Sequence, residues 1–162
     1  MEDVTTSARP VISASELLEH WQGHRKLTRR VIEFFPEKEL FEFSIGGMRT
    51  FSALAVELLA IAAPGLKEIV TGINIPFQES TENFKTKAQL LAHWDDSTEE
   101  INKYWDLLSP EKFHETNNLF GQYNFPVIQN ILYFIDNEIH HRGQGYVYLR
   151  ALGIEPPFFW ER

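Results

Sequence analysis

The chain has 162 residues, no cysteine and a formal net charge of −8 at pH 7. This length suits a single domain over residues 1–162, and 43% hydrophobic residues are enough to fill its core. The missing cysteine excludes disulfides, thiolate zinc ligands, Fe–S clusters and a cysteine nucleophile. The acidic balance argues against a general nucleic-acid binder, because binding to phosphates depends on Lys and Arg.

The start of the chain gives no targeting signal. Residues 1–10 are polar and lack the apolar segment of a signal peptide, and residues 1–12 are expected to be flexible. No stretch reaches the roughly 18–20 apolar residues that a membrane span needs. The sequence therefore predicts a cytoplasmic protein without a membrane partner.

Two helices are predicted in the first half of the chain. Ser13 and Glu16 match a capping box, and apolar residues at three- and four-residue steps then predict an amphipathic helix that ends near Pro36. Residues 48–63 are apolar on nearly all sides, which is typical of a buried helix. Pro64 and the glycine after it are expected to interrupt this second helix.

Two more helices follow a long connection. Residues 71–83 show little periodicity and predict a mobile loop. Thr86 is positioned to cap a third helix that runs to about Leu108, and the last helix extends from Pro126 to Gly153. Four long helices with little strand signal predict an all-α four-helix bundle. The connection between the second and third helices is too long for a simple hairpin.

One charge interrupts the apolar second helix. Glu57 is the single charged residue between positions 51 and 63. A buried carboxylate costs several kcal/mol unless it is paired, protonated or bound to a metal. Two interpretations are open: Glu57 emerges at the surface or in a local polar contact, or it lies inside the bundle as a functional carboxylate.

Six polar residues interrupt the last helix near its middle. Residues four apart share a helix face, so Asn137 lies one turn before His141 and Glu138 one turn before Arg142. We expect Glu138 and Arg142 to form a charge pair on a solvated face. We expect Asn137 and His141 to face the interior, because apolar residues continue their side of the helix.

An imidazole one turn away from a second ligand is a common half-site for a divalent metal. Glu57 from the neighbouring helix would supply a third ligand and a negative charge. The same spacing also arises by chance, and a lone buried histidine is more often only hydrogen-bonded. The other histidines are expected at the surface or in helix packing: His20, His24, His93 and His114.

The C-terminal sequence resembles a known family. Residues 137–144, together with 148–153 and the two prolines at 156–157, are similar to the DinB-like (YfiT-like) four-helix proteins, and residues 47–51 resemble the start of their second helix. The similarity extends from Leu17 to Trp160. It implies an up-down-down-up bundle, often a homodimer, with a divalent metal held by three histidines in the bundle interior.

The resemblance places the three metal ligands on Glu57, Asn137 and His141, and His141 alone keeps the family's histidine. Three imidazoles suit zinc or nickel, whereas a carboxylate, an amide and one imidazole make a harder, weaker site. Zinc, nickel, manganese, iron(II), magnesium and no metal at all are therefore open alternatives.

The resemblance also implies a reaction class. Relatives include transferases and isomerases that use a small thiol as cosubstrate, and a metal with an open position lowers the pKa of a bound thiol or water. We therefore expect a metal-dependent hydrolase or thiol-dependent transferase. Here Glu57 or Glu138 would act as ligand or general base, and His141 as ligand or acid–base group.

Two other functions compete with the enzyme hypothesis. One is a metal-free small-ligand-binding or structural dimer that has lost the three-histidine site. The other is DNA handling, which the family name suggests and the net charge of −8 opposes.

Overall fold

The computed structural model describes residues 10–78 and 84–162, in which four long helices form the body of the molecule. The elements in chain order are α1 (Ala14–Phe34), α2 (Glu37–Glu42), α3 (Phe51–Thr71), α4 (Lys87–Trp105), the 3₁₀ turn η2 (Glu111–His114), β1 (Thr116–Leu119), β2 (Tyr123–Pro126) and α5 (Val127–Ala151). Residues 1–9 of the expected flexible start and residues 79–83 of the expected mobile loop lie outside the described residues.

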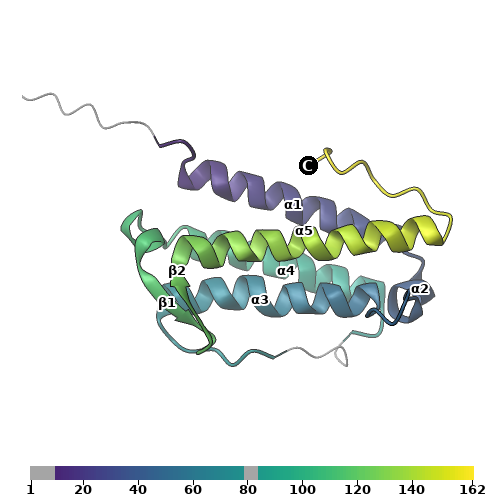
Figure 1. Cartoon of the computed structure of the whole chain (residues 1–162), viewed down its shortest axis with the longest axis horizontal. Helices are drawn as coiled ribbons and strands as arrows, with labels where there is room; N and C mark the ends of the chain where they lie inside the picture. The colour runs from purple at the N-terminus through teal and green to yellow at the C-terminus, as the bar shows by residue number, and fades with distance from the viewer. Residues whose placement is uncertain (1–9, 79–83) are drawn as a thin grey trace, which may run out of the picture.

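The four helices have the predicted up-down-down-up order. Helices α1 and α5 run in one direction, and α3 and α4 run in the opposite direction (Figure 1). Helix α1 packs against both α4 and α5, and helix α3 also packs against both α4 and α5. The prediction of an all-α bundle is confirmed, and residues 72–78 after α3 turn back alongside the bundle (Figure 1).

Side-chain caps define where the helices begin. Ser13 accepts a hydrogen bond from the backbone of Glu16, whose carboxylate accepts one from the Ser13 backbone, which completes the predicted capping box. Thr86 caps α4 by accepting a bond of 3.2 Å from the backbone N–H of Gln89. Thr50 caps α3 in the same way.

Helix α3 continues beyond the proline that was expected to end it. Pro64 lies inside α3, which runs on to Thr71 and ends at Gly72 in the left-handed conformation with φ 68°. The predicted interruption was wrong because Leu66 and Ile69 after the proline are almost completely buried. Their packing offsets the hydrogen bond that a proline inside a helix cannot make.

A small antiparallel hairpin was not predicted. Strands β1 and β2 pair between η2 and the start of α5, and their three-residue connection contains Phe120 with φ 55° and Gly121 with φ 70°. Four-residue strands are too short to show a periodic hydrophobic pattern. The six-residue helix α2 was missed for the same reason.

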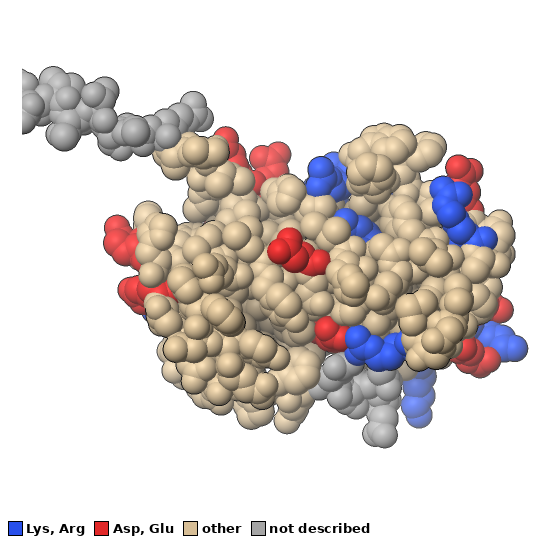
Figure 2. Space-filling view, in the orientation of Figure 1, with Lys and Arg blue, Asp and Glu red and all other residues tan. Residues whose placement is uncertain are grey.

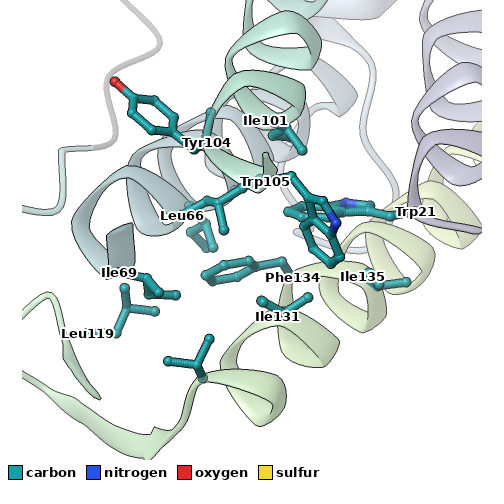
Figure 3. Packing of buried hydrophobic residues seen from close by; sticks show 14 of the residues in the cluster. Trp21, Leu66, Ile69, Ile101, Tyr104, Trp105, Leu119, Ile131, Phe134 and Ile135 are labelled. Atoms are coloured by element: carbon teal, nitrogen blue, oxygen red, sulfur yellow. The ribbon is translucent and has the colours of Figure 1, made fainter. Parts of the chain in front are cut away.

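The bundle core has two parts. Near the hairpin, Trp21, Trp105 and Phe134 pack together with aliphatic residues from all four long helices (Figure 3). Near the other end, the rings of Phe35 and Phe51 stack with centroids 4.7 Å apart.

Within the described residues, none of the helices is both long and apolar enough to cross a membrane.

Candidate functional site

The structure brings together the three side chains that the sequence singled out as a possible centre. The Oε1 atom of Glu57 on α3 lies 3.1 Å from Nε2 of His141 on α5. The same oxygen accepts a hydrogen bond of 3.3 Å from the side-chain amide of Asn137, one turn before His141. The Glu57 side chain is 15% exposed and that of His141 is 8% exposed. The polar cluster therefore lies at the edge of the interior, within reach of solvent.

A fourth residue completes this cluster. Arg49, in the segment before α3, donates a hydrogen bond to the second carboxylate oxygen of Glu57, and its side chain is 44% exposed. The Tyr148 hydroxyl donates a bond of 2.7 Å to the Arg49 carbonyl, which fixes the backbone there. Sequence reasoning used Arg49 only as part of a family pattern, because a loop residue has no helical spacing that would show its partner.

The surroundings of Glu57 keep its carboxylate ionised. Partial burial acts to raise the pKa of Glu57, but hydrogen bonds from Arg49, His141 and Asn137 together outweigh burial. The pKa of Glu57 therefore lies below its ordinary value. At neutral pH the site therefore contains an ionised carboxylate, one oxygen of which contacts the guanidinium of Arg49.

The imidazole of His141 is oriented from its other side. Its Nδ1 lies 3.4 Å from the side-chain oxygen of Gln144, and the Gln144 amide nitrogen lies 3.1 Å from the exposed His140 ring. These contacts leave Nε2 of His141 directed at Glu57. His140 itself points out of the bundle, as its position next to His141 on a helix requires.

A pocket of about 220 Å³ adjoins the cluster and has Glu57 in its wall. It extends toward the hairpin end of the bundle, where Ile61 and Tyr133 lie one turn from Glu57 and Asn137 respectively. The residues that line it are Glu57, Ile61, Phe77, Leu119, Phe120, Tyr123 and Tyr133. The cluster therefore has a small cavity beside it in which a ligand could contact the carboxylate.

Glu138 does not belong to this cluster. Its carboxylate accepts a bond of 2.7 Å from Thr28 and lies 3.5 Å from Arg25, both on α1. Arg142 donates to the Thr28 hydroxyl at 3.1 Å. Glu138 is 1% exposed and Arg142 is 5% exposed, so the predicted solvated charge pair was wrong. Helix α1 covers this face of α5, and the charges are retained there because they are paired.

His24 joins the same buried network. Its Nδ1 accepts a hydrogen bond of 2.9 Å from Arg142, and burial together with Arg142, Arg162 and His20 lowers the pKa of His24 to about 3. The network is thus a structural link between α1 and α5, and the helix-packing prediction for His24 agrees with it. The other histidines outside the cluster are exposed, as predicted: His20, His93 and His114.

The donor set does not fit a three-imidazole metal centre. Glu57, Asn137 and His141 offer one carboxylate, one amide and one imidazole, and the carboxylate is already bonded to the guanidinium of Arg49. Across residues 10–78 and 84–162, no group of three His, Asp or Glu side chains is placed to hold a metal ion. Two of the three positions therefore lack the imidazole nitrogen donors that suit zinc or nickel.

Comparison with known proteins identifies the fold and the family. The chain is similar to a DinB-like protein from Bacillus subtilis, with a TM-score of 0.74 and 22% identity over 91% of this chain and 99% of that one. It is also similar to a DinB-like protein from Bacillus cereus, with a TM-score of 0.72 and 16% identity over 90% and 97% of the two chains. No curated protein matches. The sequence profile of the DinB family matches residues 1–161, and this chain therefore belongs to the DinB family.

Proposed function

We propose that this chain is a small-ligand-binding DinB-family protein that works without a divalent metal. In this proposal the Glu57–His141 pair takes the place of the metal centre, and the adjoining pocket holds the ligand. The observation that carries the proposal is that Asn137, His141 and Arg49 all bond directly to the Glu57 carboxylate, so the atoms that would hold a metal are directed at one another. A metal ion held by Glu57, Asn137 and His141 would have to separate side chains that now bond to one another.

The chemistry of the pair suits recognition of a polar group. Glu57 is an acceptor held in place by Asn137 and His141, and such preorganised acceptors bind a ligand without ordering new side chains. His141 can exchange a proton with Glu57 across their 3.1 Å contact. The pair would therefore also serve as a general acid–base group toward a ligand bound beside it.

The test is a fragment-binding experiment on the full chain after treatment with EDTA. NMR spectra recorded with a library of small neutral, cationic and anionic fragments should show binders that shift the resonances of Glu57, Tyr133 and His141. Glu57→Gln should abolish this binding. The matched control is Glu115→Gln, which alters an exposed carboxylate paired with Lys112 and should leave binding unchanged. Absence of any binder at these resonances would refute the proposal.

A second candidate is the metal-dependent enzyme of the hydrolase or thiol-transferase type. It is supported by the contacts of Asn137 and His141, both on α5, which each lie within 3.3 Å of the Oε1 atom of Glu57 on α3. These residues would hold a hard cation such as manganese or iron(II), which would supply a Lewis acid for a bound thiol or water. Elemental analysis of protein purified without a metal-affinity tag should then give about one ion per chain, depleted in Glu57→Gln and His141→Ala.

A further inference from the structure

We infer that the pocket beside Glu57 recognises a small organic ammonium ion, an inference that rests on the proposed ligand-binding function. Among the described residues that line the pocket, Glu57 is the one that carries a formal charge. The pocket volume of about 220 Å³ is below the roughly 300–1,000 Å³ of sites for drug-sized molecules. A ligand of a few heavy atoms that carries a positive charge matches both properties.

Aromatic rings make up most of the remaining wall. They come from three separate segments of the chain: Phe77, Phe120, Tyr123 and Tyr133. The face of an aromatic ring carries negative electrostatic potential and attracts a cation within about 6 Å of its centre. An ionised carboxylate at the wall of an aromatic pocket favours an ammonium group over a neutral or anionic one.

Glu57 keeps the capacity to bind a ligand while it holds its own partners. A carboxylate can accept about four hydrogen bonds. Arg49, Asn137 and His141 account for three donors to its two oxygens. An acceptor position remains for an N–H or O–H group of a ligand.

The aromatic walls are fixed by a second buried glutamate. Glu68, which is 3% exposed, accepts a hydrogen bond of 2.8 Å from the backbone of Phe120 and another of 2.8 Å from that of Ile75. These bonds tie both the hairpin turn and the segment before Phe77 to α3. The rings of Phe77 and Phe120 consequently lie with centroids 5.8 Å apart, although Phe120 adopts an unfavourable φ of 55°.

Two of the residues that line the pocket reach the surface. The side chains of Tyr123 and Tyr133 at its rim are about half exposed. Figure 2 shows a mostly uncharged surface over β1 and β2 on the face in view. A cation can therefore approach this rim from solvent, and the carboxylate inside provides the attraction.

The test uses choline and its uncharged carbon isostere, 3,3-dimethylbutan-1-ol, titrated into the full chain and followed by NMR. Choline should shift the Tyr133 and Phe77 ring resonances and bind at least about tenfold more tightly than the alcohol. Tyr133→Leu and Phe77→Leu should each weaken choline binding about two- to fivefold, the range for a cation–π contact at an exposed site. Phe159→Leu, which removes an exposed ring on the C-terminal tail, is the matched control and should have no effect.

Three outcomes would overturn the inference. Equal affinity for choline and the alcohol would show a pocket that does not select charge, while the proposed ligand-binding function would stand. Choline binding that survives both ring substitutions and Glu57→Gln would place the cation elsewhere. If neither choline nor the alcohol binds, the ammonium inference fails, and the fragment experiment above decides separately whether the ligand-binding proposal fails with it.

Discussion

The carboxylate of Glu57 and the imidazole of His141 lie 3.1 Å apart although 84 positions separate them in the chain. The antiparallel packing of α3 on α5 produces this contact, and Arg49 holds the opposite oxygen of Glu57. The arrangement gives this DinB-family protein a hydrogen-bonded polar cluster at positions where the resemblance implies three histidines. Its consequences for charge, stability and binding can each be measured.

Arg49→Met should raise the pKa of Glu57 toward its ordinary value, because the guanidinium contact is one of the interactions that lower it. The loss in unfolding free energy should be modest, about 0.2–1 kcal/mol, since the Arg49 side chain is 44% exposed. A carbon-13 NMR titration of the Glu57 carboxyl group measures the pKa. Arg30→Met removes another exposed pair, with Glu161, and should leave the Glu57 titration unchanged.

Gly145→Ala should destabilise the bundle by about 1–3 kcal/mol, as expected for overpacking of a core. A Cβ atom at position 145 would lie 2.5 Å from the ring of Phe51, at the contact between α5 and α3. Gly143→Ala is the matched control, because its Cβ would meet no atom within 4 Å. That substitution should stabilise α5 by up to about 1 kcal/mol through helix propensity. Urea unfolding measures the free energy of unfolding of both variants. An equal loss in Gly145→Ala and Gly143→Ala would contradict the close contact at Gly145.

His24 in the buried network should make the protein less stable in mild acid. His24 has a pKa of about 3 in the folded chain against an ordinary 6.5, because of burial, the charges of Arg142 and Arg162, and His20. Between these values the unfolded chain binds a proton that the folded chain does not. The free energy of unfolding should therefore fall as pH drops below 6.5, by at most about 1.4 kcal/mol per pH unit from this group.

His24→Gln removes this titration and should flatten the pH dependence of unfolding between about pH 6.5 and 4. Urea unfolding at several pH values gives the slope for each protein. His114→Gln, at an exposed histidine outside the network, should retain the slope of the parent chain. An unchanged slope in His24→Gln would mean that the network does not hold His24 neutral.

Glu68→Gln should loosen the hairpin turn, since the amide can accept through only one of the two atoms that the carboxylate uses. The amide hydrogens of Phe120 and Ile75 should exchange faster with solvent, while amides in the middle of α1 keep their protection. Hydrogen exchange followed by NMR measures both sets. Equal protection of Phe120 in the parent and the variant would show that Glu68 does not fix the turn.

The sequence predicted the bundle and singled out Glu57, with both a surface and an interior position left open, because both inferences depend on local patterns. Glu57 was singled out because it is the one charged residue in an apolar helical segment. Asn137 and His141 were singled out because residues four positions apart share a helix face. The contact between these side chains also needed the pairing of α3 with α5, which periodicity does not specify. The family resemblance supplied that pairing.

The assignment of Glu138 to a solvated face failed for a related reason. Successive residues on a helix point about 100° apart, so Asn137 and Glu138 face different neighbours. Helix α3 covers one of these faces and α1 covers the other, so Asn137 is half-buried and Glu138 is buried. A sequence shows that two faces of a helix are polar, but it does not show which of them tertiary packing covers.

The most direct test of the metal-free proposal is the free energy of unfolding of EDTA-treated protein with and without added manganese or zinc. We predict no change with either ion, because Asn137 and His141 already bond to Glu57 and a metal ion would have to break both contacts. A metal bound to the folded chain at 100 times its dissociation constant would add about 2.7 kcal/mol. A gain of that size that disappears in Glu57→Gln and His141→Ala would contradict the proposal and establish a metal centre.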